Sequence, residues 1–189
     1  MQLQLNSAEW WETKAQKYKD KSDARDRPGE GRTAASLVTG TVLELGSAFG
    51  HFSAYLKKST QYIGIDISGV LVEEARKNYP GRLFVQANVT NFSLRQWGKC
   101  VDHVCAFQVL EHFKSEDLHK LLKLLSGISR KSLIFSVPRG KPTPSALKND
   151  GHLIGWIDEA ELSAEFGKYG EVSFWEGADN HICGEVKWF

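Results

Sequence analysis

The chain has 189 residues, the length of one ordinary domain, and 41% hydrophobic and 25% charged residues, a composition typical of a globular protein. Its net charge of +1 argues against a dedicated nucleic-acid-binding or membrane-surface protein. No uncharged apolar run approaches the roughly 18 residues of a membrane span. Three cysteines without CxxC spacing fit a reducing compartment, so we expect a cytoplasmic protein.

A helix followed by a linker is predicted for the N-terminal region. Asn6 and Glu9 have the spacing of a capping box. The next apolar and aromatic residues recur on one helical face: Trp11, Ala15 and Tyr18. Residues 20–32 are polar, charged and interrupted by a Pro-Gly pair, which is typical of a mobile linker. We expect residues 1–32 to form a lid over a single sheet core at residues 33–189.

Short runs rich in β-branched or aromatic residues alternate with helix-like segments after this linker. The predicted strands are 41–45, 62–67, 82–86, 101–107 and 131–137. Ser68 and Ser115 are predicted to cap two intervening helices, and Asp158 a later one. Strands that alternate with helices of this length indicate βαβ units and a parallel sheet.

The C-terminal residues follow a different pattern. Two predicted strands, at about 171–176 and 182–188, flank a turn that contains Gly177, Asp179 and Asn180. They are too close for a crossover helix and should pair antiparallel. The prediction is therefore a three-layer, doubly wound α/β fold whose mostly parallel sheet ends in an antiparallel hairpin.

The first predicted strand leads into a turn of small residues, in the stretch VLELGSAFGHF at residues 42–52. Ligands of open α/β sheets bind beyond the carboxyl ends of the strands, and Gly46 and Gly50 would let a ligand approach the backbone. Asp66 lies twenty residues after Gly46, where a carboxylate can accept hydrogen bonds from both ribose hydroxyls. These residues predict a site for an adenosine-containing cofactor. A dinucleotide is not expected, because Ala48 and His51 replace two glycines of the GxGxxG pattern.

Several stretches together resemble the motifs of a known family. VLELGSAFGHF, YIGIDIS, VQANVTNF, VDHVCAFQVLEHF and SLIFSVPRG are similar, in order and spacing, to those of class I S-adenosylmethionine-dependent methyltransferases. The resemblance covers roughly residues 8–175 and is strongest to the small-molecule group that includes ubiquinone and menaquinone biosynthesis enzymes. It implies a Rossmann-like, seven-stranded sheet, S-adenosylmethionine as cofactor and a small-molecule methyl acceptor.

The resemblance also implies roles for individual residues. Glu44 and the glycine turn would lie under the methionine end of the cofactor, and Asp66 would hold the ribose. Asn88 stands where the family usually has an acid that binds the adenine amino group. The N-terminal helix, with Trp11 and Tyr18, would cover the site, and plain packing of an amphipathic helix is the alternative for these two residues. The complete set of implied cofactor-binding positions is Tyr18, Glu44, Gly46, Ser47, Ala48, Gly50, Asp66, Ile67, Asn88, Val89, Gln108 and Leu110.

Two histidines are candidate general bases. A base is needed only if the accepting atom carries a proton, and a neutral imidazole suits that task. His112 follows the fourth strand and His152 lies in the segment after the fifth; a structural role is the alternative for each. The other histidines are predicted to be surface or packing residues: His51, His103, His119 and His181. No acids and histidines have the spacing of metal ligands, so no metal is predicted.

The methyl acceptor is poorly specified by the sequence. Residues 138–156 are too long for a simple connection, and the resemblance implies that they help to build the substrate pocket. Arg139, Lys141 and Lys148 would suit an acidic or phosphorylated acceptor, and a solvated loop is the alternative. The main prediction is a small-molecule methyltransferase without membrane or nucleic-acid partners. An enzyme that acts on RNA or protein, and a non-catalytic cofactor-binding subunit, are the alternatives. The oligomeric state is not predicted.

Overall fold

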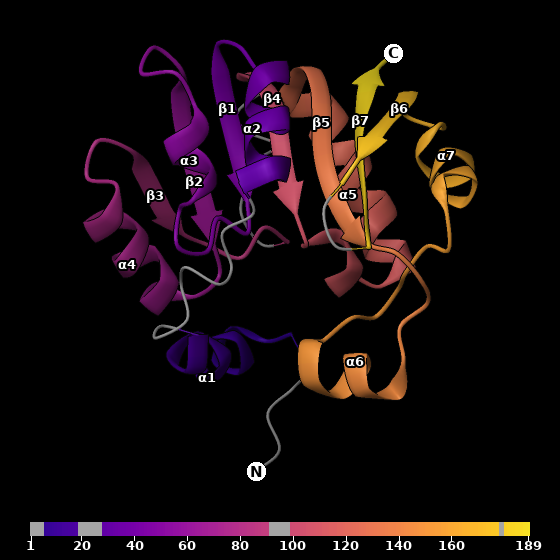
Figure 1. Ribbon diagram of the computed structural model, residues 1–189, viewed down its shortest axis with the longest axis horizontal. Helices are drawn as coiled ribbons and strands as arrows, with labels where there is room; N and C mark the ends of the chain where they lie inside the picture. Colours follow the sequence, from indigo (N-terminus) through magenta and orange to yellow (C-terminus); the bar gives the residue numbers. More distant parts are fainter. Residues whose placement is uncertain (1–5, 19–27, 91–98, 178–179) are drawn as a thin grey trace.

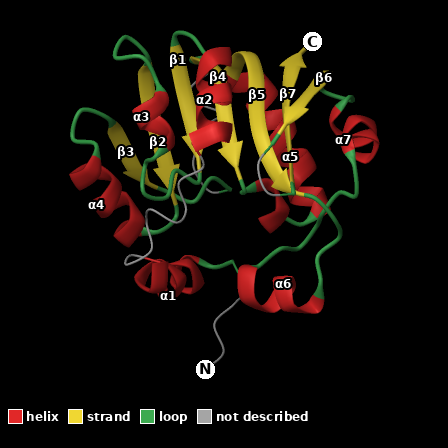
Figure 2. Ribbon diagram, in the orientation of Figure 1, coloured by secondary structure: helices red, strands yellow, loops and turns green. Residues whose placement is uncertain are grey.

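The computed structural model describes residues 6–18, 28–90, 99–177 and 180–189, which build a seven-stranded sheet (Figures 1 and 2). The strand order is β3-β2-β1-β4-β5-β7-β6. The strands are β1 (Thr41–Leu45), β2 (Gln61–Asp66), β3 (Leu83–Gln86), β4 (Val101–Phe107), β5 (Ser129–Pro138), β6 (Gly170–Glu176) and β7 (His181–Trp188). Strands β1 to β5 pair in parallel, whereas β7 pairs antiparallel with β5 and β6. The predicted fold class is confirmed.

Helices cover both faces of this sheet. They are α1 (Ala8–Tyr18), α2 (Pro28–Leu37), α3 (Phe52–Tyr55), α4 (Gly69–Asn78), the 3-10 helix η4 (Leu110–His112), α5 (Ser115–Ile128), α6 (Pro144–Asp150) and α7 (Glu159–Phe166). Val42 packs in one core with α2, α3 and α4, while its neighbour Leu43 packs in the other with α5 and α7, since side chains alternate along a strand. Figure 1 shows α2 and α3 in front of the sheet and α5 behind it. None of these described helices combines the length and apolar character needed to cross a membrane.

The strand order reverses between β1 and β4, which is where open α/β sheets bind ligands. The carboxyl ends of the parallel strands point toward α1 and α6, which lie beneath that edge in Figure 1. A site at this edge is therefore overlain by the N-terminal helix and by the segment that follows β5.

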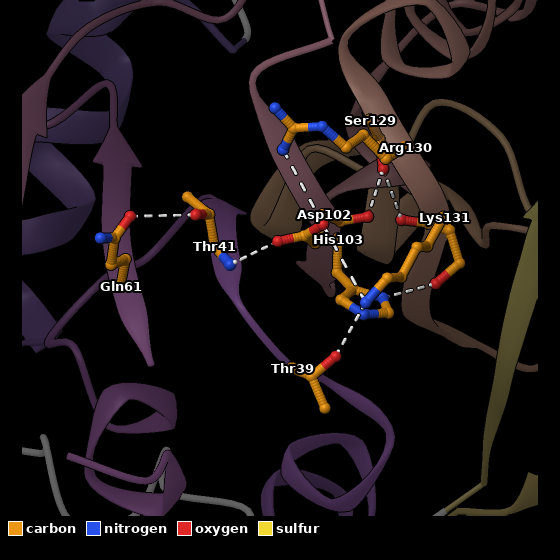
Figure 3. A network of polar contacts seen from close by, with 9 residues as sticks. Thr39, Thr41, Gln61, Asp102, His103, Ser129, Arg130 and Lys131 are labelled. Carbon is orange, nitrogen blue, oxygen red and sulfur yellow. Dashed lines mark hydrogen bonds and ion pairs between the residues drawn. The ribbon is translucent and has the colours of Figure 1, made fainter. Parts of the chain in front are cut away.

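At the opposite ends of the strands, their amino ends, Asp102 of β4 contacts both neighbouring strands (Figure 3). Its Oδ2 atom accepts a hydrogen bond from the backbone N–H of Thr41 at 2.9 Å, and its backbone carbonyl accepts one from Ser129 Oγ at 2.9 Å. The Arg130 guanidinium lies 3.8 Å from Asp102 Oδ1. These contacts hold the amino ends of β1, β4 and β5, away from the switch point.

Helix α2 differs from the sequence prediction, because it begins at Pro28, inside the predicted linker. Proline suits the first helical position, where its missing N–H is not needed. Glu30 in the first turn is buried and bonds to His181, a contact across 151 residues that no local pattern indicates. Residues 20–27 of the predicted linker lie outside the described residues.

The predicted helix caps are partly confirmed. The side chains of Ser68 and Asp158 accept hydrogen bonds from the backbone of α4 and α7 as expected. Helix α1 is instead capped by Ser7, whose Oγ accepts from the N–H of Trp10 at 3.2 Å, because the Asn6 side chain makes tertiary contacts. Ser115 is the first residue of α5 rather than its cap.

Candidate active site

A cavity of about 770 Å³ lies at the carboxyl ends of the parallel strands. Its walls come from α1, the turn after β1, the segments after β2, β3 and β4, and the residues after α6. Of the predicted site positions, the following line it: Tyr18, Glu44, Gly46, Ser47, Ala48, Asp66, Ile67, Asn88, Val89, Gln108, His112 and His152. The structure thus brings most of the predicted residues to one place.

Two predicted cofactor contacts, Gly50 and Leu110, do not line this cavity. Leu110 is fully buried in the apolar core under η4. Gly50 has φ of +81°, and a Cβ there would lie 2.6 Å from the ring of Phe84. Both positions contribute to packing, and their predicted contact with the cofactor stays a prediction.

Asp66 organises the glycine turn as well as the cavity wall. Its two carboxylate oxygens accept hydrogen bonds from the backbone N–H groups of Ala48 and Ser68, each at 2.9 Å. Ala48 has a positive φ of 45°, so the bond holds a residue in a backbone region that favours glycine. Burial raises the pKa of Asp66 to about 6, although the two backbone bonds oppose this shift. At neutral pH the group is ionised, and a carboxylate that accepts two bonds still has lone pairs for a ligand.

Glu44, the acid inside β1, is held in the cavity wall by Tyr62. The Tyr62 hydroxyl donates a hydrogen bond to Glu44 Oε2. Burial raises the pKa of Glu44 to about 8; the Tyr62 bond opposes the shift and the charge of Asp66 adds to it. Near neutral pH, Glu44 is therefore mostly protonated. Of these two acids, Asp66 is the one that carries a negative charge.

Helix α1 is fastened across the site by Glu12. Its carboxylate accepts from Ser68 Oγ at 2.7 Å and from the backbone N–H of Gly69 at 2.6 Å and of Val70 at 3.3 Å. These N–H groups begin α4, so the acid also lies at the favourable end of that helix dipole. The contact joins α1, whose Trp11 and Tyr18 line the cavity, to the start of α4.

Replacing Glu12 with Ala is expected to lower the unfolding midpoint by about 3–6 °C, because the change removes charge-assisted bonds that together stabilise by about 1.5 kcal/mol. Affinity for S-adenosylhomocysteine should fall several-fold in the same variant. Differential scanning fluorimetry and calorimetric titration measure the two effects. Gln16→Ala, an exposed position on the same helix, is the matched control and should change neither quantity.

Glu111, His112 and His152 come together in the wall of the cavity. His112 Nε2 lies 3.9 Å from Glu111 Oε1, and His152 Nε2 lies 4.0 Å from the same oxygen. His112 Nδ1 lies 3.1 Å from the carbonyl oxygen of Gly151. Burial lowers the pKa of His112 to about 4, so its imidazole is neutral at pH 7 but only weakly basic; burial also lowers the pKa of His152. Sequence spacing did not predict this cluster, because His152 comes 41 residues after Glu111.

The sequence patterns also did not predict a second histidine–glutamate pair. His181, predicted to be a surface or packing residue, lines the cavity, and its Nδ1 lies 2.7 Å from Glu30 Oε1. Glu30 lines the cavity as well and is 4% exposed. The pair connects the start of α2 to the start of β7, which only the folded sheet brings together.

The basic residues after β5 do not act as a free positive patch. Arg139 forms an ion pair with Glu159, with Nη1 and Oε2 3.2 Å apart, and Lys141 pairs with Glu161. Both acids belong to the first turn of α7. The expectation of an acidic acceptor therefore loses two of its three supporting residues.

One family model matches part of the chain. Residues 43–132, from β1 into β5, match the family described as methyltransferase domain. The matched segment, just under half of the chain, is similar to methyltransferase domains. A comparison with curated proteins found no significant match.

Solved structures share the fold of this methyltransferase domain along most of the chain. The DhpI complex with S-adenosylhomocysteine has a TM-score of 0.72 at 17% identity, over 96% of this chain and 94% of that one. A Haloferax volcanii putative methyltransferase, solved with the activator Trm112, has a TM-score of 0.69 at 15% identity, over 97% and 96%. The N-terminal domain of EvdMO1, solved with S-adenosylhomocysteine and D-fucose, has a TM-score of 0.64 at 17% identity, over 85% and 83%.

The cavity residues fit S-adenosylmethionine, the cofactor of class I methyltransferase domains. Gly46 has φ of +66° and leaves its backbone open on the cavity wall. Asp66 offers an ionised, oriented carboxylate for ribose hydroxyls. Asn88 lines the wall, but its Oδ1 atom accepts from the backbone N–H and the hydroxyl of Thr90, so binding an amino group there would compete with these bonds.

The affinity for S-adenosylhomocysteine is expected to fall about tenfold from pH 7 to pH 5. The ionised form of Asp66 is the predicted acceptor for the ribose hydroxyls, and a group with a pKa of about 6 is mostly protonated at pH 5. An ordinary aspartate would stay ionised there. Two other acids, Glu12 of α1 and Glu44 of β1, lie near the Asp66 carboxylate and are not changed in this experiment. Calorimetric titrations from pH 5 to 8 test this, and Asp66→Asn should remove the step. A flat profile in the unaltered protein would contradict the assignment.

Proposed function

We propose that this methyltransferase transfers a methyl group from S-adenosylmethionine to a small molecule that enters the cavity beneath α1 and α6. The observation that carries the proposal is that one cavity joins Asp66 and the glycine turn to the Glu111–His112–His152 cluster. When bound, the cofactor supplies an already activated methyl group, so the protein mainly has to align the acceptor and exclude water.

Different residues would bind the cofactor, cover it and assist the acceptor. Asp66 and the Gly46–Ala48 turn would bind the cofactor, with Ile67, Val89 and Gln108 lining the same space. Helix α1 would cover the bound cofactor through the Glu12 contact. His112 and His152 are the candidates that assist loss of a proton from the acceptor, since both line the far end of the cavity.

A small acceptor is favoured by the way the cavity is enclosed. Two helices from distant parts of the chain, α1 and α6, lie over the carboxyl edge, and Asn6 Nδ2 donates to the carbonyl groups of His112 and Gly151 between them. EvdMO1, which shares the fold, was solved with a sugar. The Haloferax volcanii protein, which also shares the fold, was solved with the activator Trm112. An enzyme that acts on RNA or protein is the second candidate.

Thermal unfolding with S-adenosylhomocysteine, and with NAD in parallel, tests the proposal first. A ligand at 100 times its dissociation constant stabilises by about 2.7 kcal/mol, which raises the midpoint by roughly 5–10 °C in a domain of this size. We expect the shift with S-adenosylhomocysteine alone. A shift with NAD alone would overturn the proposal.

The acceptor class is tested by measuring release of S-adenosylhomocysteine with pools of small hydroxylated compounds, and with RNA and protein fractions. Turnover with small compounds is expected. Turnover confined to RNA, with an affinity that falls steeply as salt rises, would favour the second candidate. Cofactor binding without turnover on any pool would point to a non-catalytic subunit.

A further inference from the structure

The cluster of Glu111, His112 and His152 contains the donor atoms of a transition-metal site. Two imidazole nitrogens and a carboxylate oxygen lie within 4.8 Å of one another. Three protein ligands of this kind, two histidines and one glutamate, are typical of catalytic zinc sites that keep a position open for another ligand.

The separations suit an ion after small side-chain movements. The nitrogens of His112 and His152 lie 3.9 and 4.0 Å from Glu111 Oε1, longer than a hydrogen bond. In a tetrahedral zinc site, bonds of about 2.0–2.2 Å place the ligand atoms roughly 3.3–3.5 Å apart. Shifts of about half an ångström would bring each of the two nitrogens to that spacing from Glu111 Oε1.

The surrounding backbone already orients the ligands. His112 Nδ1 donates to the carbonyl of Gly151 at 3.1 Å, which places the lone pair on Nε2, the atom nearer Glu111. Metal-bound histidines almost always donate their other N–H group in this way. The carbonyl of Glu111 accepts from the N–H groups of Leu153 at 2.7 Å and Ile154 at 3.2 Å, so η4 and the loop that carries His152 are joined.

We propose that Glu111, His112 and His152 bind a divalent transition-metal ion of the zinc class at the acceptor end of the cavity. The role of this ion rests on the proposed function: its open position would bind an acceptor hydroxyl. A bound hydroxyl loses its proton more readily, as zinc-bound water does. The O–H bond breaks, its electron pair stays on the oxygen that receives the methyl group, and the proton passes to water. The accepting atom would then be oxygen, with the histidines acting through the ion.

Titration of the tag-free, chelator-treated protein with ZnCl₂ and CoCl₂ tests this inference. We expect one ion per chain by calorimetry, and Co²⁺ should give the visible absorption of a four- or five-coordinate site. Because even outer-shell changes at metal sites weaken binding by about 10- to 100-fold, His152→Ala should weaken it by at least about 100-fold. His152→Gln serves if the alanine variant does not fold. His119→Ala and His181→Ala are controls, since both histidines pair with other groups, and these variants should bind as the unaltered protein does.

The outcomes separate this inference from the proposed function. A thermal shift with S-adenosylhomocysteine, together with no stoichiometric Zn²⁺ binding, would overturn the metal site and leave the methyltransferase proposal standing. Zinc binding that is lost in His152→Ala, without any response to S-adenosylhomocysteine, would support the metal site and overturn the proposed function. Zinc binding that His152→Ala leaves unchanged, or that His181→Ala removes, would place the ion elsewhere and overturn the inference.

Discussion

Asp66→Ala is expected to weaken the binding of S-adenosylhomocysteine by about 100-fold. The change removes the proposed acceptor for the ribose hydroxyls, where each charge-assisted bond contributes about 1.5–3 kcal/mol. A loss of about 2.7 kcal/mol corresponds to 100-fold in affinity. It also removes the bonds from Asp66 to the N–H groups of Ala48 and Ser68, so the glycine turn loses its anchor. Calorimetric titration gives the affinity directly.

Asp102→Ala is the matched control for this variant. Asp102 is also an acid on a central strand, and it also accepts a backbone N–H, from Thr41, but at the opposite edge of the sheet (Figure 3). Its removal should lower stability and leave the affinity for S-adenosylhomocysteine unchanged. Unchanged affinity in a folded Asp66→Ala protein would refute the ribose assignment. A loss of equal size in both variants would show a general effect on the fold.

Gly46→Ala is expected to lower the free energy of unfolding by about 2–5 kcal/mol and to reduce cofactor affinity. Gly46 has φ of +66°, where a Cβ costs about 1–2 kcal/mol. The added Cβ would also lie 2.4 Å from Val109 Cγ2, and relief of such overpacking costs a further 1–3 kcal/mol or so. Denaturant titration measures the loss of stability.

Two further variants separate the steric contact with Val109 from the backbone strain at Gly46. Gly81→Ala tests a glycine with nothing within 4 Å of its added Cβ, and its stability should change by less than about 1 kcal/mol. The double variant Gly46→Ala with Val109→Ala removes the steric contact but not the backbone strain. We expect a favourable coupling between the two changes. Additive effects would mean that Val109 does not limit the turn.

Short-range patterns predicted the parts of the fold that depend on neighbours in the sequence. The strand at 41–45 was placed correctly because its side chains are apolar on both faces, as a strand between two helical layers requires. The caps at Ser68 and Asp158 were found because each side chain bonds a backbone N–H three residues later. Asp66 was found for a similar reason, since its distance from the glycine turn is set by one βαβ unit.

The predictions that did not hold concern contacts between distant segments. The start of α2 depends on Glu30 meeting His181, and the role of Asn6 depends on the carbonyl groups of His112 and Gly151. The cluster of Glu111, His112 and His152 also depends on distant segments. Helix α6 and its left-handed C-cap at Gly151, with φ of +75°, bring His152 close to Glu111. None of these approaches has a fixed spacing in the sequence.

The position of β7 constrains how the chain can fold during its synthesis. This strand is made last among the seven, yet it lies between β5 and β6 rather than at the edge. Until β7 has left the ribosome, β5 has an open edge with buried-type side chains such as Phe135 and Val137, and open edges of this kind promote intermolecular pairing. A nascent chain would therefore need protection from aggregation until β7 has emerged. A protein truncated before His181 would lack the strand that pairs with both β5 and β6.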